Sequence, residues 1–378
     1  MNPRAGIEDA IRSETCSDEA FDHLALALAK TQLSRIPAWR AYAESTGIGA
    51  EDVADWRSIP PVPCSAFKTH DLSFAASAAS GESSEPDGTD GPGVVFETSG
   101  TSISRPGRVH LASTALYEAS LLRSFERYLL PDGVRLPALV FGPRAVDAPR
   151  SSLWFMVDAV VRRLARGGTW IVEGGVPRWE IADAALQTAV SRGEPVLLLG
   201  TTLLFLAYFE RLDVGGARFE LPPGSRAMDT GGSKGLRAEF KRDEVERAFE
   251  RALGIPRTHL VNEYGMAEMG SQFYDDTLAA FRDRREPLPG KRIPPWVRTR
   301  VLDPESMREL PEGMRGILVH ADLANEEIPF LIQTEDIGSR VGDRLMVEGR
   351  LLGAEARGCS LAFEQFLEAS EAREGRAP

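Results

Sequence analysis

Residues 94–111, "VVFETSGTSISRPGRVHL", join a short apolar run to a loop rich in glycine, serine, threonine and arginine. The apolar run predicts a strand, so the loop begins where a strand ends. Glycine lets a backbone approach a ligand closely, and successive N–H groups with hydroxyls can surround phosphate oxygens. The candidate phosphate ligands are Thr98, Ser99, Gly100, Thr101 and Ser102. A hydroxyl-rich surface turn would have the same composition, so this stretch leaves both interpretations open.

The segments after this loop alternate between strand and helix patterns. Apolar runs at residues 137–143 and 195–202 predict strands covered on both faces, as in a parallel sheet, and helical patterns separate them. From residue 296 onward, short strand patterns are separated by turns. The expected fold is therefore α/β, with mainly parallel sheets covered by helices and a small β-rich subdomain.

This pattern divides the chain of 378 residues into five regions. A helical region that packs on the core comes first, and Ser17 is the expected N-cap of one of its helices. The predicted boundaries are 1–79 for that region, 80–93 for a flexible polar linker, 94–295 for the α/β nucleotide-binding core, 296–350 for the β-rich subdomain and 351–378 for a C-terminal segment.

Composition excludes several classes of function. The net charge of −12 argues against a general binder of nucleic acid or anionic membranes, because both require clustered cations. No apolar run is long enough to span a bilayer, and the first residues lack a signal-peptide pattern, so we expect a cytoplasmic protein. Three cysteines give no disulfide framework, and five scattered histidines give no zinc motif.

Two further glycine-containing motifs follow predicted strands. In "DTGGSKG" (residues 229–235), Gly231 and Gly232 would let a flat ligand rest on the backbone, although a tight turn before a helix has the same pattern. In "VNEYGMAEMG" (residues 261–270), the ring of Tyr264 before Gly265 could stack on a ligand or pack in the core. The carboxylate of Glu268 suits Mg²⁺, a hard cation that takes oxygen ligands.

The last third of the chain contributes an acid, a cation and a thiol. Asp336 in "IQTEDIGSR" could accept hydrogen bonds from ribose hydroxyls or form a turn, and Arg340 is a candidate phosphate or ribose ligand. Cys359 follows Arg357, and a nearby cation lowers the pKa of a thiol and so increases the nucleophilic thiolate. A buried, inert cysteine is the alternative.

The order of these motifs resembles the adenylate-forming superfamily of acyl-CoA synthetases, nonribosomal adenylation domains and luciferases. "TSGTS" is similar to its phosphate loop, "YGMAE" to its Tyr/Glu motif, and "EGR" to the Gly-Arg before its hinge, while "TED" stands where Thr-Gly-Asp is usual. "SIPPVPCSAFKTHDL" and "GRLLGAEARGCSL" resemble segments of the LuxE-type acyl-protein synthetases. The resemblance covers residues 59–361, most of the chain.

The resemblance implies the large N-terminal-type domain of an adenylate-forming enzyme and an acid–thiol ligase that uses ATP and Mg²⁺. A carboxylic acid, fatty or aryl, would become an acyl-adenylate. Cys359 would then take the acyl group as a thioester and deliver it to a partner acyl reductase. Glu268 would hold Mg²⁺, the motif glycines and Tyr264 would hold adenine, and Asp336 would hold the ribose. An acyl- or aryl-CoA ligase, or a non-catalytic nucleotide-binding subunit of a larger complex, are the alternatives.

Two departures from the family pattern qualify these expectations. Relatives carry a mobile C-terminal domain with a lysine that assists adenylation, whereas nineteen residues without lysine follow Cys359. We therefore expect adenylation to proceed without that lysine, with another cation, or with a partner's help. Because "TED" replaces Thr-Gly-Asp, Glu335 is a second candidate for the ribose ligand beside Asp336.

Overall fold

The computed structural model describes residues 3–50, 52–74, 93–98, 106–231, 241–350 and 357–374, with side chains of the last segment described at 362–370. Contacts group the chain into two compact units, neither of which is one continuous segment. Unit 1 consists of Met1–Leu121, Met266–Gln272 and Arg292–Pro378. Unit 2 consists of Leu122–Gly265 and Phe273–Lys291.

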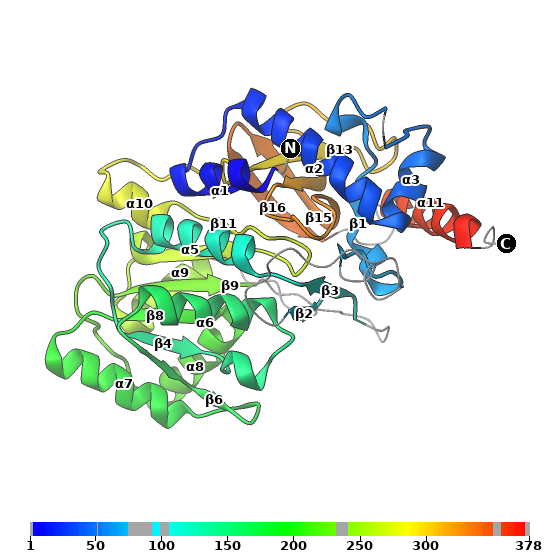
Figure 1. The fold of residues 1–378 in the computed structure, drawn as a ribbon. Helices are drawn as coiled ribbons and strands as arrows, with labels where there is room; N and C mark the ends of the chain where they lie inside the picture. Colours follow the sequence, from blue (N-terminus) through cyan, green and yellow to red (C-terminus); the bar gives the residue numbers. More distant parts are fainter. Residues whose placement is uncertain are drawn as a thin grey trace. The chain divides into compact units, whose positions relative to one another are not determined.

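A parallel sheet forms the core of unit 2 (Figure 1). Its strands lie in the order β10, β9, β8, β4 and β5, and each neighbouring pair is parallel. The bounds are β4 Ala138–Phe141, β5 Gly168–Trp170, β8 Leu197–Thr201, β9 Arg226–Thr230 and β10 Leu260–Tyr264, with β11 (Phe273–Tyr274) antiparallel to β10. The inner strands β4, β8 and β9 are buried almost throughout. A strand covered on both faces has no solvent side, which explains these continuous apolar runs.

Six helices of the described residues accompany this sheet in unit 2, and an aromatic cluster joins two of them, α8 and α9, to β4. The six are α6 (Ser152–Leu164), α7 (Trp179–Arg192), α8 (Thr202–Gly215), α9 (Arg242–Leu253), α10 (Thr277–Arg282) and the later turns of α5 (Ala115–Leu129). Ring centroids lie 4.5 Å apart between Phe141 and Phe205 and 4.8 Å apart between Phe205 and Phe249. Such pairs add about 0.5–1.5 kcal/mol each beyond their buried area. The cluster therefore joins β4 to the first turns of α8 and to the later turns of α9.

Unit 1 contains an antiparallel sheet, formed mainly by the short strands that follow residue 296. β13 pairs with β14, β14 with β15 and β15 with β16, while β1 lies parallel to β15. A separate hairpin is formed by β2 and β3. The bounds are β1 Val62–Pro63, β2 Val94–Glu97, β3 Arg108–Leu111, β13 Val297–Leu302, β14 Gly316–Asp322, β15 Leu331–Val341 and β16 Arg344–Arg350.

In the part that the structure describes, unit 1 contains three N-terminal helices and one C-terminal helix, and the sequence predicts the start of one of them. The helices are α1 (Arg4–Ser13), α2 (Asp18–Arg35), α3 (Pro37–Ser45) and α11 (Arg357–Glu374). The Ser17 hydroxyl accepts a hydrogen bond from the Ala20 N–H at 3.2 Å, which confirms the predicted N-cap of α2. Pro37 stands at the first turn of α3, where a missing N–H costs nothing.

Short elements complete the described part. They are β6 (Val172–Glu173), β7 (Val176–Pro177), β12 (Lys291–Arg292), η1 (Trp56–Ser58), η2 (Cys64–Lys68), η3 (Ala145–Asp147) and η4 (Arg257–His259). None of the helices in the described ranges is long and apolar enough to cross a bilayer.

The predicted fold class is confirmed: the chain is an α/β protein with a large mixed sheet and a partly parallel core. The predicted strands around residues 137–143 and 195–202 are β4 and β8. The predicted domain boundaries stay predictions, because the two contact units are each built from separated segments. Most of the predicted linker, residues 80–92, lies outside the described residues.

Candidate functional site

The glycine and tyrosine predicted to hold adenine lie at the carboxyl ends of two neighbouring parallel strands of unit 2. β9 ends at Thr230 and β10 at Tyr264, and the register pairs Thr230 with Glu263. Gly231 therefore stands beside the end of β10. Ligands of open α/β sheets bind outside the carboxyl ends of the strands. The fold thus brings Gly231 and Tyr264 to one edge of the sheet, while Gly232 lies outside the described residues.

A buried polar cluster fixes the main chain at Gly231. The Thr202 hydroxyl lies 2.8 Å from Asp229 Oδ2 and 2.9 Å from the Gly231 carbonyl oxygen, so it can donate to either. Arg242 Nη1 donates to Asp229 Oδ1 at 2.7 Å, and Asn262 Nδ2 donates to Asp229 Oδ2 at 3.1 Å. Gly231 has a φ of +80°, a conformation that favours glycine. The turn after β9 is therefore tied to the first residues of α8 and α9.

Tyr264 is packed as well as placed at the sheet edge. Its side chain is buried, and its ring centroid lies 5.6 Å from that of Phe273 across the β10–β11 pair. The neighbouring Glu263 is also buried and accepts a hydrogen bond from the Thr230 hydroxyl. The core-aromatic interpretation of Tyr264 therefore has structural support, and adenine stacking by this ring stays a prediction.

Glu268 lies in unit 1, in a short loop that is held by a buried amide. Its side chain is buried, as is that of Asn325. Asn325 Nδ2 donates to the Glu268 carbonyl oxygen at 2.9 Å, and the Gly270 N–H donates to Asn325 Oδ1 at 2.7 Å. A Cβ at Gly270 would lie 2.9 Å from that of Ala324, closer than real Cβ contacts allow. The loop and the turn after β14 are thus in direct contact.

A hydroxyl network continues this contact at the next residue. Ser271 Oγ donates to Asp322 Oδ1 at 2.7 Å, and Trp296 Nε1 donates to Ser271 Oγ at 2.9 Å. The Ala324 N–H also donates to Asp322 Oδ1 at 3.0 Å. All of these side chains are buried, and burial raises the pKa of Asp322 to about 6.

The predicted phosphate loop begins on the β2–β3 hairpin. The Thr98 N–H donates to the Gly107 carbonyl oxygen at 2.9 Å, and the Gly107 N–H donates to Thr98 Oγ1 at 3.0 Å. Thr98 and Gly107 therefore close the base of the loop between the strands. Ser99, Gly100, Thr101 and Ser102 lie outside the described residues.

Asp336 and Arg340 lie at different places on β15. Asp336 is buried, and its Oδ1 lies 3.6 Å from Arg350 Nε. Arg350 Nη1 is also 3.6 Å from Glu335 Oε2, so one cation serves both candidate ribose ligands. Arg340, about 13 Å further along the strand, pairs with Glu312 at 2.8 Å. The roles of Asp336 and Arg340 toward a nucleotide stay predictions.

Cys359 is part of α11, whose main chain is described there. Further along the helix, the buried Phe366 ring packs against the rings of Tyr42 and His70, with centroids 5.3 and 5.2 Å apart. The helix is therefore docked on α3 and on the segment after η2. By contrast, burial raises the pKa of the Cys16 thiol, which disfavours the reactive thiolate.

The structure identifies polar residues that sequence reasoning missed. Asp229, Thr202 and Arg242 meet beside Gly231, and Asp322 and Asn325 hold the loop of Glu268. An acidic residue inside the buried strand "RAMDT" is a signal that could have identified Asp229. Asn325 gives no such signal, because its partner Glu268 is 57 residues away in the sequence.

The donor set fits Mg²⁺ only as part of a nucleotide complex. The described residues hold no group of three or more histidine, cysteine, aspartate or glutamate side chains that could bind a metal. Mg²⁺ commonly uses one or two carboxylates and takes its other ligands from phosphates and water. The single candidate carboxylate of Glu268 is compatible with that mode.

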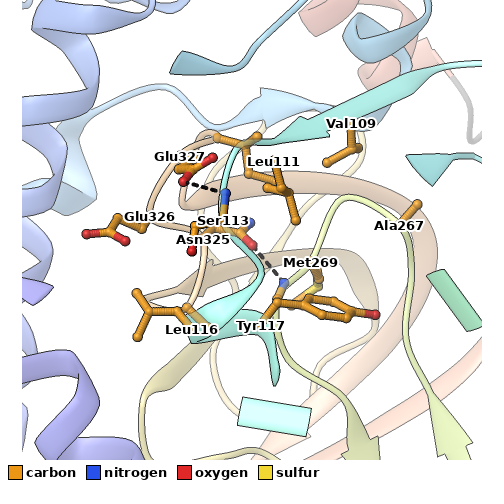
Figure 2. A pocket seen from close by; sticks show the side chains of 13 residues that line it. Val109, Leu111, Ser113, Leu116, Tyr117, Ala267, Met269, Asn325, Glu326 and Glu327 are labelled. Atoms are coloured by element: carbon orange, nitrogen blue, oxygen red, sulfur yellow. Dashed lines mark hydrogen bonds between the residues drawn. The ribbon is translucent and has the colours of Figure 1, made fainter. Parts of the chain in front are cut away.

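A small pocket lies beside the Glu268 loop within unit 1 (Figure 2). Apolar side chains of β3, α5 and the loop line it together with polar groups of the turn after β14, including Asn325 and Glu327. Glu327 accepts hydrogen bonds from the N–H groups of Ala112 and Ser113, the latter at 3.1 Å, which joins the end of β3 to this turn. The loop is therefore packed against several segments of unit 1.

Solved structures with a similar fold are adenylate-forming ligases. An open conformation of 2-hydroxyisobutyryl-CoA ligase in complex with 2-HIB-AMP and CoA has a TM-score of 0.60 at 16% identity, covering 89% of this chain and 76% of that chain. The same ligase in the postadenylation state has a TM-score of 0.59 at 15% identity, covering 92% and 73%. The fold is thus that of the adenylate-forming ligases.

Comparison of the sequence with known proteins identifies one family among proteins with this fold. The family "Acyl-protein synthetase, LuxE" matches residues 39–368, so the chain belongs to the LuxE acyl-protein synthetase family and is a ligase of that type. The long-chain-fatty-acid–luciferin-component ligase of Vibrio harveyi is 23% identical over 342 residues, covering 86% of this chain and 82% of the relative. The protein of the same name from Aliivibrio fischeri is 25% identical over 114 residues, covering 28% of each. The resemblance inferred from the motifs is confirmed.

Proposed function

We propose that the chain uses ATP to activate a long-chain fatty acid as an acyl-adenylate and then accepts the acyl group on Cys359. The observation that carries this proposal is the meeting of Gly231 and Tyr264 at adjacent ends of parallel strands. This edge is the usual nucleotide position in such sheets. Membership of the acyl-protein synthetase family supports the reaction, and the name of the Vibrio harveyi relative supports a fatty acid as the substrate.

Each motif has a role in this proposal. The hydroxyls and N–H groups of residues 98–102 bind the phosphates, and Gly231, Gly232, Tyr264 and Gly265 hold the adenine. Asp336 binds the ribose, and Arg340 is the candidate for a further phosphate or ribose contact. Glu268 holds Mg²⁺, which when bound neutralises phosphate charge.

Two transfers make up the proposed reaction. In the first, a carboxylate oxygen of the acid bonds to the α-phosphorus of ATP, and the bond to the pyrophosphate oxygen breaks. In the second, the Cys359 thiolate bonds to the acyl carbon, the carbon–oxygen bond to AMP breaks, and AMP leaves. Positioning dominates the first step, because there is little covalent chemistry for the protein to perform. Covalent catalysis defines the second step, and the thioester then serves a partner acyl reductase.

Labelling with a radioactive fatty acid, ATP and Mg²⁺ tests both transfers. Wild type should release pyrophosphate and retain a label that hydroxylamine removes. Cys359→Ser should release pyrophosphate but retain less than about a tenth of the label, because a serine hydroxyl without a base is a poor nucleophile at neutral pH. Cys64→Ser is the matched control, since this half-buried thiol begins η2 and should leave the label unchanged.

The outcomes separate this proposal from its alternatives. Equal labelling of Cys359→Ser and wild type would exclude Cys359 as the acyl acceptor. Product that appears as free acyl-CoA when CoA is added, with no label on the protein, would favour a CoA ligase. An isolated chain that releases no pyrophosphate with any fatty or aryl acid would favour a nucleotide-binding subunit.

A further inference from the structure

Glu268 depends on other segments for its orientation, because it lies outside any helix or strand. Glu268 stands four residues after the end of β10. Within its loop, the Met269 N–H donates a hydrogen bond to the Met266 carbonyl oxygen at 3.2 Å. A carboxylate that binds a metal must be held in a well-defined position. Residues that hydrogen-bond to the ligand or to its main chain usually hold it there.

The amide of Asn325 binds the peptide groups on both sides of Met269. It donates to the Glu268 carbonyl oxygen at 2.9 Å and accepts from the Gly270 N–H at 2.7 Å. An Asn or Gln side chain carries a donor and an acceptor on one rigid group, so it can take both bonds as a neighbouring strand would. Asn325 Nδ2 also donates to the Pro329 carbonyl oxygen at 3.1 Å, which ties the amide to its own turn.

The turn that carries Asn325 is itself held from the other side. Gln32 of α2 is fully buried, and its Nε2 donates to the carbonyl oxygens of Asn325 and Ile328, each at 2.6 Å. Its Oε1 accepts from the Phe330 N–H at 2.9 Å. Gln32 thus supports the same turn with a second buried amide, but none of these bonds reaches the Glu268 loop.

We propose that Asn325 is a positioning residue for Glu268: its amide fixes the main chain of the loop and so directs the Glu268 carboxylate toward the metal of a Mg·ATP complex. The inference rests on the proposed function for the role of Glu268 and adds a residue to it. Asn325 acts through hydrogen bonds to the loop, whereas Gln32 supplies stability to the turn.

Metal binding and stability are measured separately in the test. Mn²⁺ serves as a spectroscopic probe for the Mg²⁺ position, and its dissociation constant is measured by electron paramagnetic resonance with saturating α,β-methylene-ATP. The variants are Asn325→Ala, Asn325→Asp, Gln32→Met and Glu268→Gln. Asp keeps the acceptor for the Gly270 N–H but turns an oxygen toward the Glu268 carbonyl. Melting temperatures and the KM for Mg²⁺ in pyrophosphate release accompany each variant.

We expect both Asn325 variants to raise the Mn²⁺ dissociation constant and the KM for Mg²⁺ by roughly tenfold or more, as losses of such supporting partners do. Gln32→Met should lower the melting temperature about as much as the Asn325 variants do. It should change the Mn²⁺ dissociation constant less than about twofold, because the hydrogen bonds of Gln32 join α2 to the turn after β14 and do not reach the Glu268 loop. Glu268→Gln should weaken the Mn²⁺ site most.

Several results would overturn the inference. Asn325 variants that bind Mn²⁺ like Gln32→Met would reduce Asn325 to a stabilising residue. The same conclusion holds if neither Asn325 variant folds while Gln32→Met does. Glu268→Gln with unchanged Mn²⁺ binding would remove the metal role and the positioning role together. A wild type that binds Mn²⁺ with the nucleotide but releases no pyrophosphate would contradict the proposed function alone.

Discussion

Two buried aspartates, one in each unit, are stabilised in opposite ways. In unit 2, Asp229 is 1% exposed and pairs with Arg242 at 2.7 Å, beside the turn that carries Gly231. In unit 1, Asp322 is 0% exposed and is held by neutral donors, the Ser271 hydroxyl and the Ala324 N–H. A counter-ion keeps a buried carboxylate charged, whereas neutral donors only partly offset the cost of burial. The turn at Gly231 is thus held by an ion pair, and the Glu268 loop by a largely neutral network.

Breaking the ion pair of unit 2 should have the largest effect. Arg242→Ala would leave the Asp229 carboxylate buried without its cation, which typically costs about 3–5 kcal/mol in the free energy of unfolding. Urea denaturation measures this loss. The double variant Asp229→Asn, Arg242→Ala is the matched control and should recover part of it, because no uncompensated charge remains. If the free energy of unfolding of Arg242→Ala lies within about 1 kcal/mol of the wild-type value, the ion pair is not essential for stability.

The second test is the pH dependence of the stability contributed by Asp322 in unit 1. Asp322 has a folded-state pKa of about 6, above its ordinary value of 3.8. Its contribution to stability is therefore complete below about pH 4 and is lost as the pH rises through 6. Asp322→Asn does not titrate, so its stability relative to wild type should improve by roughly 1–3 kcal/mol from pH 4 to pH 7, at about 1.4 kcal/mol per pKa unit.

The buried His320 on the same strand makes this difference measurement necessary. Burial lowers the pKa of His320 to about 3, so its contribution is present above pH 6.5 and lost as the pH falls. Both proteins contain this histidine, and subtracting their urea unfolding free energies at each pH cancels its effect. A difference that stays flat between pH 4 and 7 would show that Asp322 does not carry a raised pKa.

Substitution of a glycine beside each aspartate should have a smaller effect on stability, for a different reason in each unit. Gly270→Ala brings a Cβ to 2.9 Å from the Ala324 Cβ and 3.0 Å from its main chain, so it should cost about 1–3 kcal/mol and weaken Mg²⁺ use. Gly231→Ala meets no atom within 4 Å but has a φ of +80°, so it should cost about 1 kcal/mol. Thermal unfolding with an Mg²⁺ titration ranks the two, and the reverse order would contradict the packing argument.

The smallest effect on stability is expected at Arg340. This arginine pairs with the half-exposed Glu312 at 2.8 Å, and such surface pairs contribute about 0–1 kcal/mol. Arg340→Gln should therefore leave the melting temperature nearly unchanged. If Arg340 also binds nucleotide, the KM for ATP in pyrophosphate release should rise severalfold, whereas Glu312→Gln, the matched control, should not change it. An unchanged KM for ATP in both variants would remove Arg340 from the site.

The class of the fold and the positions of most motifs can be predicted from the amino-acid sequence. Continuous apolar runs identify β4 and β8 as buried strands, and Ser17 marks the start of α2, because these signals depend on neighbouring residues. The strand ends at Gly231 and Tyr264 could also be found, since turn glycines follow apolar runs. The family resemblance read from the motifs agrees with the match over residues 39–368.

The polar groups that support those motifs come from distant parts of the chain and are visible in the folded protein alone. Asn325 reaches Glu268 across 57 residues, and Gln32 reaches the same turn across 293. Arg350, not Arg340, stands beside Asp336, because the antiparallel register of β15 and β16 pairs residue 336 with residue 350. Such contacts depend on register and on which segments fold against one another, and local sequence patterns do not encode that choice.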